Sequence, residues 1–347
     1  MNDNPGKDSV DKLNLFQSTQ YRLTMRRTIR HPVFFLFLLV AAWLPAAASS
    51  EGSFQRTLNV TGPVNLDLNT GSGNVNVRTG SSSEVQVTGH IKATNWFGGD
   101  ADERIKRIEA NPPIEQNGNE IRIGHVNDTE IFHNISISYD LVVPAETQLH
   151  SHTGSGSQSV EGLRGQIEIE SGSGSLKISD IADTVRAETG SGEIAIDKVK
   201  GNVRTKAGSG SIRATDIAGG FEGHTGSGHI VLEQTASGSV HADTGSGGLE
   251  LRGVHGSLDA QAGSGSISAE GNPTGSWKVH SGSGTIRLKL ASDVAFDLDA
   301  HTSSGSISVS QPVTVQGSMG RRELRGKVHG GGVPVEVETG SGNIEIR

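Results

Sequence analysis

Apolar and polar residues alternate with a period of two on both sides of a recurring Gly-Ser-Gly triplet. Five residues before a triplet the side chain is apolar, and four residues before it the side chain is charged or His, as at Ile167 and Glu168. After the triplet the alternation resumes, as at Leu176 and Ile178. This pattern is typical of strands that bury one face. The triplets begin at Gly71, Gly154, Gly172, Gly190, Gly208, Gly226, Gly245, Gly263, Gly282 and Gly340.

The spacing of the triplets predicts the architecture. From Gly154 to Gly282 successive triplets are 18 or 19 residues apart, which is a solenoid period and too regular for a flexible linker. A single coil buries too few aliphatic side chains to fold alone, so coils must stack at about 4.8 Å. We expect the triplets to be corners, where glycine adopts positive φ and lets successive backbones approach closely. The predicted fold is all-β, a parallel β-solenoid resembling a β-helix.

The regular coils are expected over residues 149–310, within a single domain at 49–347 that begins with one coil-like unit. Residues 80–148 form a small α+β insert that we expect to cap the first coils. Its predicted elements are a strand at Val85 and Val87, a helix over Asp102–Ala110, a hairpin at Asn117-Gly118 and an alternating strand from Ile135 to Leu141. Residues 311–347 are expected to form an irregular C-terminal coil.

The N-terminal region predicts export. Residues 25–48 combine basic Arg26, Arg27 and Arg30, an apolar run over 33–44 and small residues at 46–48, which is the organisation of a signal peptide. Residues 1–24 are a polar extension, so Met25 is an alternative start to Met1. The run is short for a membrane span. We expect a protein of the periplasm, cell surface or extracellular space, in contact with a membrane only if the signal stays uncleaved.

These features together resemble a known family. The string ISYDLVVPAET over residues 137–147, the serial Thr-Gly-Ser-Gly turns and the closing Gly-Ser-Gly-Asn-Ile-Glu-Ile are similar to the bacterial "putative adhesin" family, a domain-of-unknown-function family with a β-solenoid structure. The resemblance covers residues 54–347 and does not include the extension before Met25. It implies an extracytoplasmic, non-catalytic scaffold, and it supplies no catalytic residues.

Composition excludes several functions. The chain has 30 basic and 38 acidic residues, a net charge of −8, which argues against nucleic-acid binding by phosphate neutralisation. It has no cysteine, so disulfides, thiolate metal ligands and thiol nucleophiles are excluded. The Gly-rich turns lie between strands, without the following helix that a phosphate site needs, and they lack the Asp of a calcium-binding repeat.

Histidines recur two residues before the triplet, and the last two of them are expected on neighbouring coils, where they could share a metal ion. The same column contains Glu170, Glu188 and Lys206, as a solvated outer face would. We therefore expect no metal and no cofactor. The histidines of this column are His152, His224, His280 and His301.

Two functions compete for the charged outer face. Neighbouring coils alternate in sign, as Glu168 with Arg186, Arg204 with Glu222, and Asp259 with Lys278 and then Asp299, which is typical of cross-strand pairs that fix register. This favours an exported, non-enzymatic scaffold that acts in cell-envelope or surface interaction. The alternative is a carbohydrate-active solenoid enzyme, a polysaccharide lyase or hydrolase, with Glu170 and Glu188 as acid and base.

Two further features concern partners. Trp96 and Phe97, followed by two glycines, are the candidate ligand contacts for an envelope glycan or another surface protein; the competing interpretation is that they pack the cap on the first coil. The last strand ends at Arg347, with no capping segment after Ile346, so it predicts an open edge for self-association by strand pairing. Alternatively, residues 311–334 fold over that edge.

Overall fold

A computed structural model describes residues 50–93, 100–125, 131–315 and 320–347 of the chain. All of the described residues lie in one compact unit, residues 47–347. These residues contain one helix, and their strands join in one hydrogen-bonded network of 27 strands. The all-β, solenoid-like fold that the sequence predicts is confirmed. No described helix is both long and apolar enough to cross a membrane.

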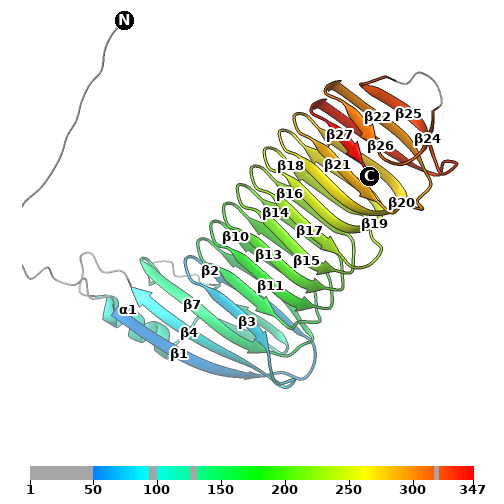
Figure 1. Ribbon diagram of the computed structural model, residues 1–347. Coiled ribbons are helices and arrows are strands. Elements are labelled where there is room, and N and C mark those ends of the chain that lie inside the picture. The colour runs from blue at the N-terminus through cyan, green and yellow to red at the C-terminus, as the bar shows by residue number, and fades with distance from the viewer. Residues whose placement is uncertain (1–49, 94–99, 126–130, 316–319) are drawn as a thin grey trace, which may run out of the picture. The chain divides into compact units, whose positions relative to one another are not determined.

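Each coil contributes one strand before its Gly-Ser-Gly triplet and one strand after it (Figure 1). Two long strands, β19 (Leu249–Ala262) and β20 (Ile267–Ser281), contain a post-triplet segment followed by the pre-triplet segment of the next coil. The other pre-triplet strands are β2 (Val64–Thr70), β8 (Thr147–Thr153), β10 (Ile167–Ser171), β12 (Val185–Thr189), β14 (Val203–Ala207), β16 (Phe221–Thr225), β18 (Val240–Thr244), β22 (Phe296–Ser304) and β26 (Val333–Ser341). The other post-triplet strands are β3 (Val75–Thr79), β9 (Gln158–Glu161), β11 (Leu176–Ile181), β13 (Ile194–Val199), β15 (Ile212–Ile217), β17 (Ile230–Gln234), β21 (Ile286–Leu290), β23 (Ile307–Val309) and β27 (Ile344–Ile346).

Equivalent residues of successive coils pair in register. Ile167 of β10 pairs in parallel with Leu149 of β8 and with Val185 of β12, and Leu176 of β11 pairs with Ile194 of β13. Each of these apolar side chains is buried inside the coil. The core is therefore a set of aliphatic columns that run along the stack, with one residue per column from each coil.

The triplet glycines are required for close stacking and not for positive φ. The expected positive φ at the triplets is wrong, because the described glycines with positive φ lie elsewhere, for example Gly118. A Cβ added to Gly172 or Gly174 would instead overlap the carbonyl oxygen of Gly154 or Gly156 in the preceding coil. The left-handed backbone sits at a different corner, where Asp180, Lys198 and Asp216 have φ of 56°, 56° and 54°.

In several coils a buried hydroxyl directly before the triplet links the corner to the preceding coil. Thr189 Oγ1 accepts a hydrogen bond from the Gly192 N–H at 3.1 Å and donates to the Gly174 carbonyl of the preceding coil at 2.9 Å. Ala207 and Ala262 interrupt the series. The same double contact is made by Thr153, Ser171, Thr225 and Thr244.

At the N-terminal end the insert adds strands outside the first coil. β6 (Glu120–Ile123) and β7 (Ile135–Val143) pair in parallel with β2 and β3, while β4 (Glu84–Ala93) and β1 (Ser50–Asn59) follow β7 in antiparallel order. β5 (Ile114–Asn117) forms the predicted hairpin with β6.

The insert also contains the predicted helix, which is α1 (Ala101–Ala110). It buries Ile105 and Ile108, and its Glu109 accepts a hydrogen bond from the Ser53 N–H of β1 at 2.8 Å. The helix therefore packs on the outermost strands of this end.

At the C-terminal end the chain does not follow stack order. β26 lies between β20 and β22, and β27 lies between β21 and β23, so the last coil is inserted between two earlier ones. The predicted open edge at Ile344–Ile346 is therefore wrong, because β27 is paired on both sides. β25 (Glu323–Val328) pairs antiparallel with β22, and β24 (Val313–Val315) pairs antiparallel with β25. The alternative, that residues 311–334 fold over the edge of β27, is also wrong, because β24 and β25 extend the sheet from β22 instead.

Candidate binding surface

The outward side chains of the pre-triplet strands form two columns of charged and polar residues, which we call the pre-triplet face. Because outward residues of a strand alternate with buried ones and the coils are in register, each column runs along the stack. The first column, four residues before the triplet, is Asp67, His150, Glu168, Arg186, Arg204, Glu222, His241, Asp259, Lys278, Glu336 and Asp299 in stack order. The second column, two residues before it, is Asn69, His152, Glu170, Glu188, Lys206, His224, Asp243, Gln261, His280, Glu338 and His301.

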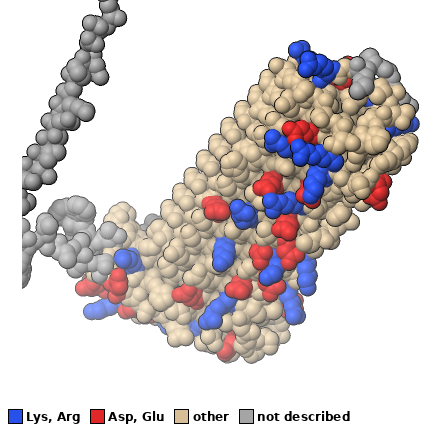
Figure 2. All heavy atoms as spheres, in the orientation of Figure 1, with Lys and Arg blue, Asp and Glu red and all other residues tan. Residues whose placement is uncertain are grey.

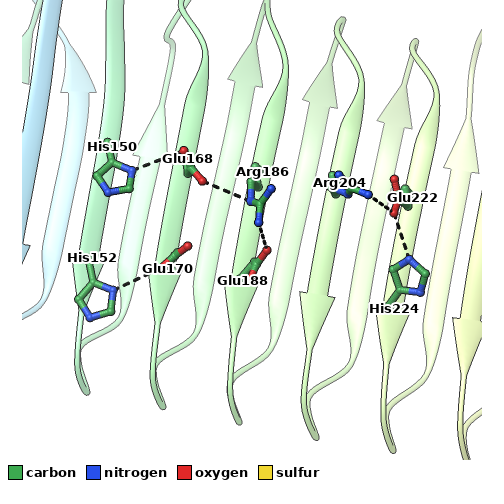
Figure 3. Close-up of polar contacts among 9 residues, drawn as sticks. All are labelled: His150, His152, Glu168, Glu170, Arg186, Glu188, Arg204, Glu222 and His224. Carbon is green, nitrogen blue, oxygen red and sulfur yellow. Dashed lines mark hydrogen bonds and ion pairs between the residues drawn. The ribbon is translucent and has the colours of Figure 1, made fainter.

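Many of these charges are paired across neighbouring coils (Figure 3). Glu168 lies 3.6 Å from His150 Nδ1 on one side and 3.3 Å from Arg186 Nε on the other. Arg204 donates to Glu222 at 2.6 Å. Figure 2 likewise shows basic and acidic side chains interspersed along the coils on the side in view. The predicted pairs Glu168–Arg186 and Arg204–Glu222 are present, but the alternation of sign is not continuous, because Arg186 and Arg204 are like-charged neighbours.

The inserted last coil changes two predicted neighbours. Glu336 lies between Lys278 and Asp299, so Lys278 does not face Asp299 directly. Glu338 likewise separates His280 from His301, so the expectation that these two histidines occupy neighbouring coils is wrong. The period of the sequence reveals which residues share a column but not the order in which the coils stack.

Glu170 and Glu188, the candidate acid and base, are neighbours in the second column. Each is already engaged: Glu188 accepts from Arg186 at 2.7 Å, and Glu170 lies 3.5 Å from His152 Nδ1. The hydrogen bond from Arg204 lowers the pKa of Glu222, and a second hydrogen bond from His224 acts in the same direction. A lowered pKa makes Glu222, which is not one of the two candidate residues, a poorer proton donor at neutral pH.

The histidines of the pre-triplet face lie at separate positions along its two columns. Within the four described segments, no group of three His, Asp or Glu side chains is arranged to hold a metal ion. His224 and His241 lie close together, with ring centroids 5.1 Å apart, and each is within ion-pair distance of a carboxylate.

A groove of about 480 Å³ runs beside the first column, and we call it the pre-triplet groove. One wall holds charged side chains of the first column, from Arg204 to Lys278. The opposite wall is a third column, six residues before the triplet, which sequence reasoning missed. The signal was present as a change in size: this column has Gln148 and Gln166 in the early coils and small residues later. The small members that line the groove are Thr184, Asn202, Gly220, Ser239, Ser257 and Ser276.

A second cavity of about 610 Å³ lies between the insert and the first coil, lined by residues that include Asp67, Arg122, His125 and Tyr139. Tyr139 is buried, which raises the pKa of its hydroxyl. Its ring packs edge-on against that of Phe54, with the ring centroids 6.3 Å apart. The predicted ligand contacts Trp96 and Phe97 lie outside the described residues, so their role stays a prediction.

Solved structures that are similar to this chain include two proteins of bacterial origin. One is a "putative cell adhesion protein" from Clostridium sporogenes, 14% identical, with 86% of this chain and 99% of that chain covered and a TM-score of 0.21. The other is a "putative adhesin" from Bacteroides fragilis, 14% identical, with 86% and 98% covered and a TM-score of 0.29. At these TM-scores neither neighbour supports an inference about this protein.

No curated protein matches the chain. The model of one family, Toastrack DUF4097, matches residues 64–347, which include every Gly-Ser-Gly coil described above. The resemblance to an adhesin-like family of unknown function is thereby confirmed. Since the match spans more than half of the sequence, the chain belongs to the Toastrack DUF4097 family.

Proposed function

We propose that the protein is an exported, non-enzymatic solenoid scaffold that makes adhesion-like contacts at the cell envelope or cell surface, with an envelope glycan or another surface protein as partner. The observation that supports this most is the pre-triplet face, a long surface whose outward residues are held in fixed columns by cross-strand pairing. Such a surface presents repeated contacts at a constant spacing, which suits recognition of an extended or repetitive partner. Export is supported by the signal-like segment at residues 25–48.

A scaffold fits this face better than a hydrolase or lyase. The acids at its centre are bound by arginine or histidine neighbours, and Glu222 has a lowered pKa. The two catalytic carboxyls of a glycosidase instead flank one scissile bond. Glu170 and Glu188 are adjacent on one outer face, each beside its own basic partner.

The proposal is tested by measuring both the cellular location of the protein and its activity on polysaccharides. Cells that express the full chain with its own N-terminal segment are fractionated, and the purified protein is incubated with envelope polysaccharides while reducing ends and unsaturated sugars are measured. The proposal predicts protein in the envelope or surface fraction and no sugar release. Retention in the cytoplasm would contradict the export part. Sugar release that disappears in a Glu170→Gln, Glu188→Gln variant would overturn the non-enzymatic part.

A further inference from the structure

The pre-triplet groove has a consistent composition along its length. Its small wall presents one hydroxyl, amide or glycine per coil from β12 to β20, and its other wall presents one charged or His side chain per coil from β14 to β20. Ser239 and Ser257 are exposed at its centre. The small wall therefore offers a hydrogen-bonding side chain on five of its six coils, all except that of Gly220, and the row runs along the stack and across the strands.

A second hollow continues the groove toward the N-terminus. It has a volume of about 530 Å³ and is lined by members of the same two columns, including Gln148, Gln166 and Glu168. The coils of Gln166 and Thr184 are adjacent, since β10 pairs directly with β12. The two hollows thus lie in line on neighbouring coils, an arrangement that fits a long ligand better than a compact one.

The spacing of the coils favours a glycan over a polypeptide as the ligand of the groove. Coils repeat at about 4.8 Å, whereas an extended polypeptide advances about 3.3 Å per residue and would fall out of step with them. A hexose unit in an extended glycan is about as long as one coil spacing, so successive sugars can meet successive coils. The six coils that line the groove extend over about 24 Å, or about five sugar units.

The balanced charge of the groove favours a neutral ligand over a polyanion. Its charged side chains are Arg204, Glu222, Asp259 and Lys278, two of each sign. Arg204 is bound to Glu222 at 2.6 Å, and His241 Nδ1 lies 3.3 Å from Asp259. A polyanion would meet two carboxylates in the groove, whereas the hydroxyl groups of a neutral glycan can pair with ions of either sign and with the serines.

From this geometry we propose that the pre-triplet groove binds a neutral, linear glycan that lies along the stack, with about one sugar per coil. This inference rests on the proposed surface function and deepens it. It places the ligand on the regular coils, at a distance in sequence from the Trp96-Phe97 pair.

The experiment measures affinity against chain length. Purified full-length protein is titrated calorimetrically with neutral linear oligosaccharides of two to eight units from the cellulose, chitin and mannan series, and with oligogalacturonate as the anionic comparison. Affinity is expected to rise with length and level off at about five units, the span of the groove, and the anionic series is expected to bind more weakly. Absence of binding in all three neutral series, or tighter binding of oligogalacturonate, would overturn the proposal.

Matched variants locate the site. Ser239→Tyr and Ser257→Tyr each place a ring in the groove, while Ser246→Tyr and Ser264→Tyr place the same ring on exposed triplet turns of neighbouring coils. The groove variants are expected to weaken binding about tenfold or more and the turn variants less than about twofold, with unchanged melting temperatures. Equal losses in both sets would overturn the groove assignment. If groove variants instead keep wild-type attachment to cells, the groove proposal fails while the proposed surface function stands.

Discussion

At the scale of residues, the fold depends on what is missing at the corners as much as on what fills the core. Gly172 and Gly174 stack on Gly154 and Gly156 with no room for a Cβ. The hydroxyl of Thr189 then satisfies two backbone groups of two coils in a buried position. Together these contacts hold successive corners at strand spacing, which keeps the columns of the outer face in line.

The glycine contacts predict that alanine destabilises the protein at one triplet glycine and not at another. Gly174→Ala is expected to destabilise the protein by about 3 kcal/mol or more, because backbone of the preceding coil must move. Gly71→Ala is the control, since a Cβ there meets nothing within 4 Å, and its effect is expected to stay under about 1 kcal/mol. Urea unfolding followed by circular dichroism measures both. Equal stability of the two variants would show that the corners are not closely stacked.

The hydroxyl contacts predict a second result. Thr189→Val keeps the volume but leaves the Gly192 N–H and the Gly174 carbonyl without their partner, at an expected cost of about 1–3 kcal/mol. Thr189→Ser retains the hydroxyl and should cost less. Thermal unfolding compares the two. If valine were as stable as threonine, the double contact would not contribute to stability.

Sequence reasoning found the inward residues because a period of two marks them directly; Ile167, Ile178 and Ile196 are all buried as the pattern requires. It assigned the wrong reason to the glycines, since both close approach and positive φ select glycine, and the letters alone do not separate them. It noted the threonine before the triplet but could not assign its role, because a buried and an exposed hydroxyl look alike in a sequence.

At the scale of elements, the strands, the helix α1 and the hairpin at Asn117-Gly118 were predictable from local pattern. The position of the last coil was not. Repeats show that β26 and β27 form a coil, but nothing local says that this coil lies between β20/β21 and β22/β23. Both ends of the parallel stack finish in antiparallel strands, β4 and β1 at one end and β25 and β24 at the other.

The inserted coil predicts the effect of a truncation. Removing residues 333–347 deletes β26 and β27, so β20 and β21 each lose the partner on one side and the β22–β25 segment loses its contact with the stack. Limited proteolysis should then cleave the segment between Ile286 and residue 332 at least about tenfold faster than in the full chain, because it opens locally. Unchanged protection would mean that the last coil is a terminal addition.

The Arg204–Glu222 pair, which joins β14 and β16, is expected to make the stability of the fold depend on pH. The pKa of Glu222 is lowered from its ordinary value of 4.5, so the pair stabilises the fold above that value and the stabilisation is lost as pH falls through the lower folded pKa. The side chain is about a third exposed, so the contribution should be under about 1 kcal/mol. NMR titration of Glu222 checks this: Arg204→Gln should raise its pKa. An unchanged pKa in that variant would exclude the pair as the cause.

At the scale of the solenoid unit, the described coils build a surface with one repeat per coil. The pre-triplet groove lies between the third column and the first, and the second column lies beyond the first. The columns are in register because the strands from β8 to β20 pair in parallel. The candidate site could be only partly predicted. The charged columns were visible in the aligned repeats. The groove was not, because it arises from the difference in side-chain size between two adjacent columns and appears only when the coils are stacked in three dimensions.

The central claim is that this surface binds without catalysis, and one measurement tests it directly. Labelled full-length protein is added to whole cells, and bound protein and released sugar are measured together for the wild type and for the Ser239→Tyr, Ser257→Tyr double variant. The account predicts saturable binding by the wild type, binding reduced about tenfold or more in the variant, and no sugar release by either. Sugar release by the wild type, or full binding by the variant, would contradict it.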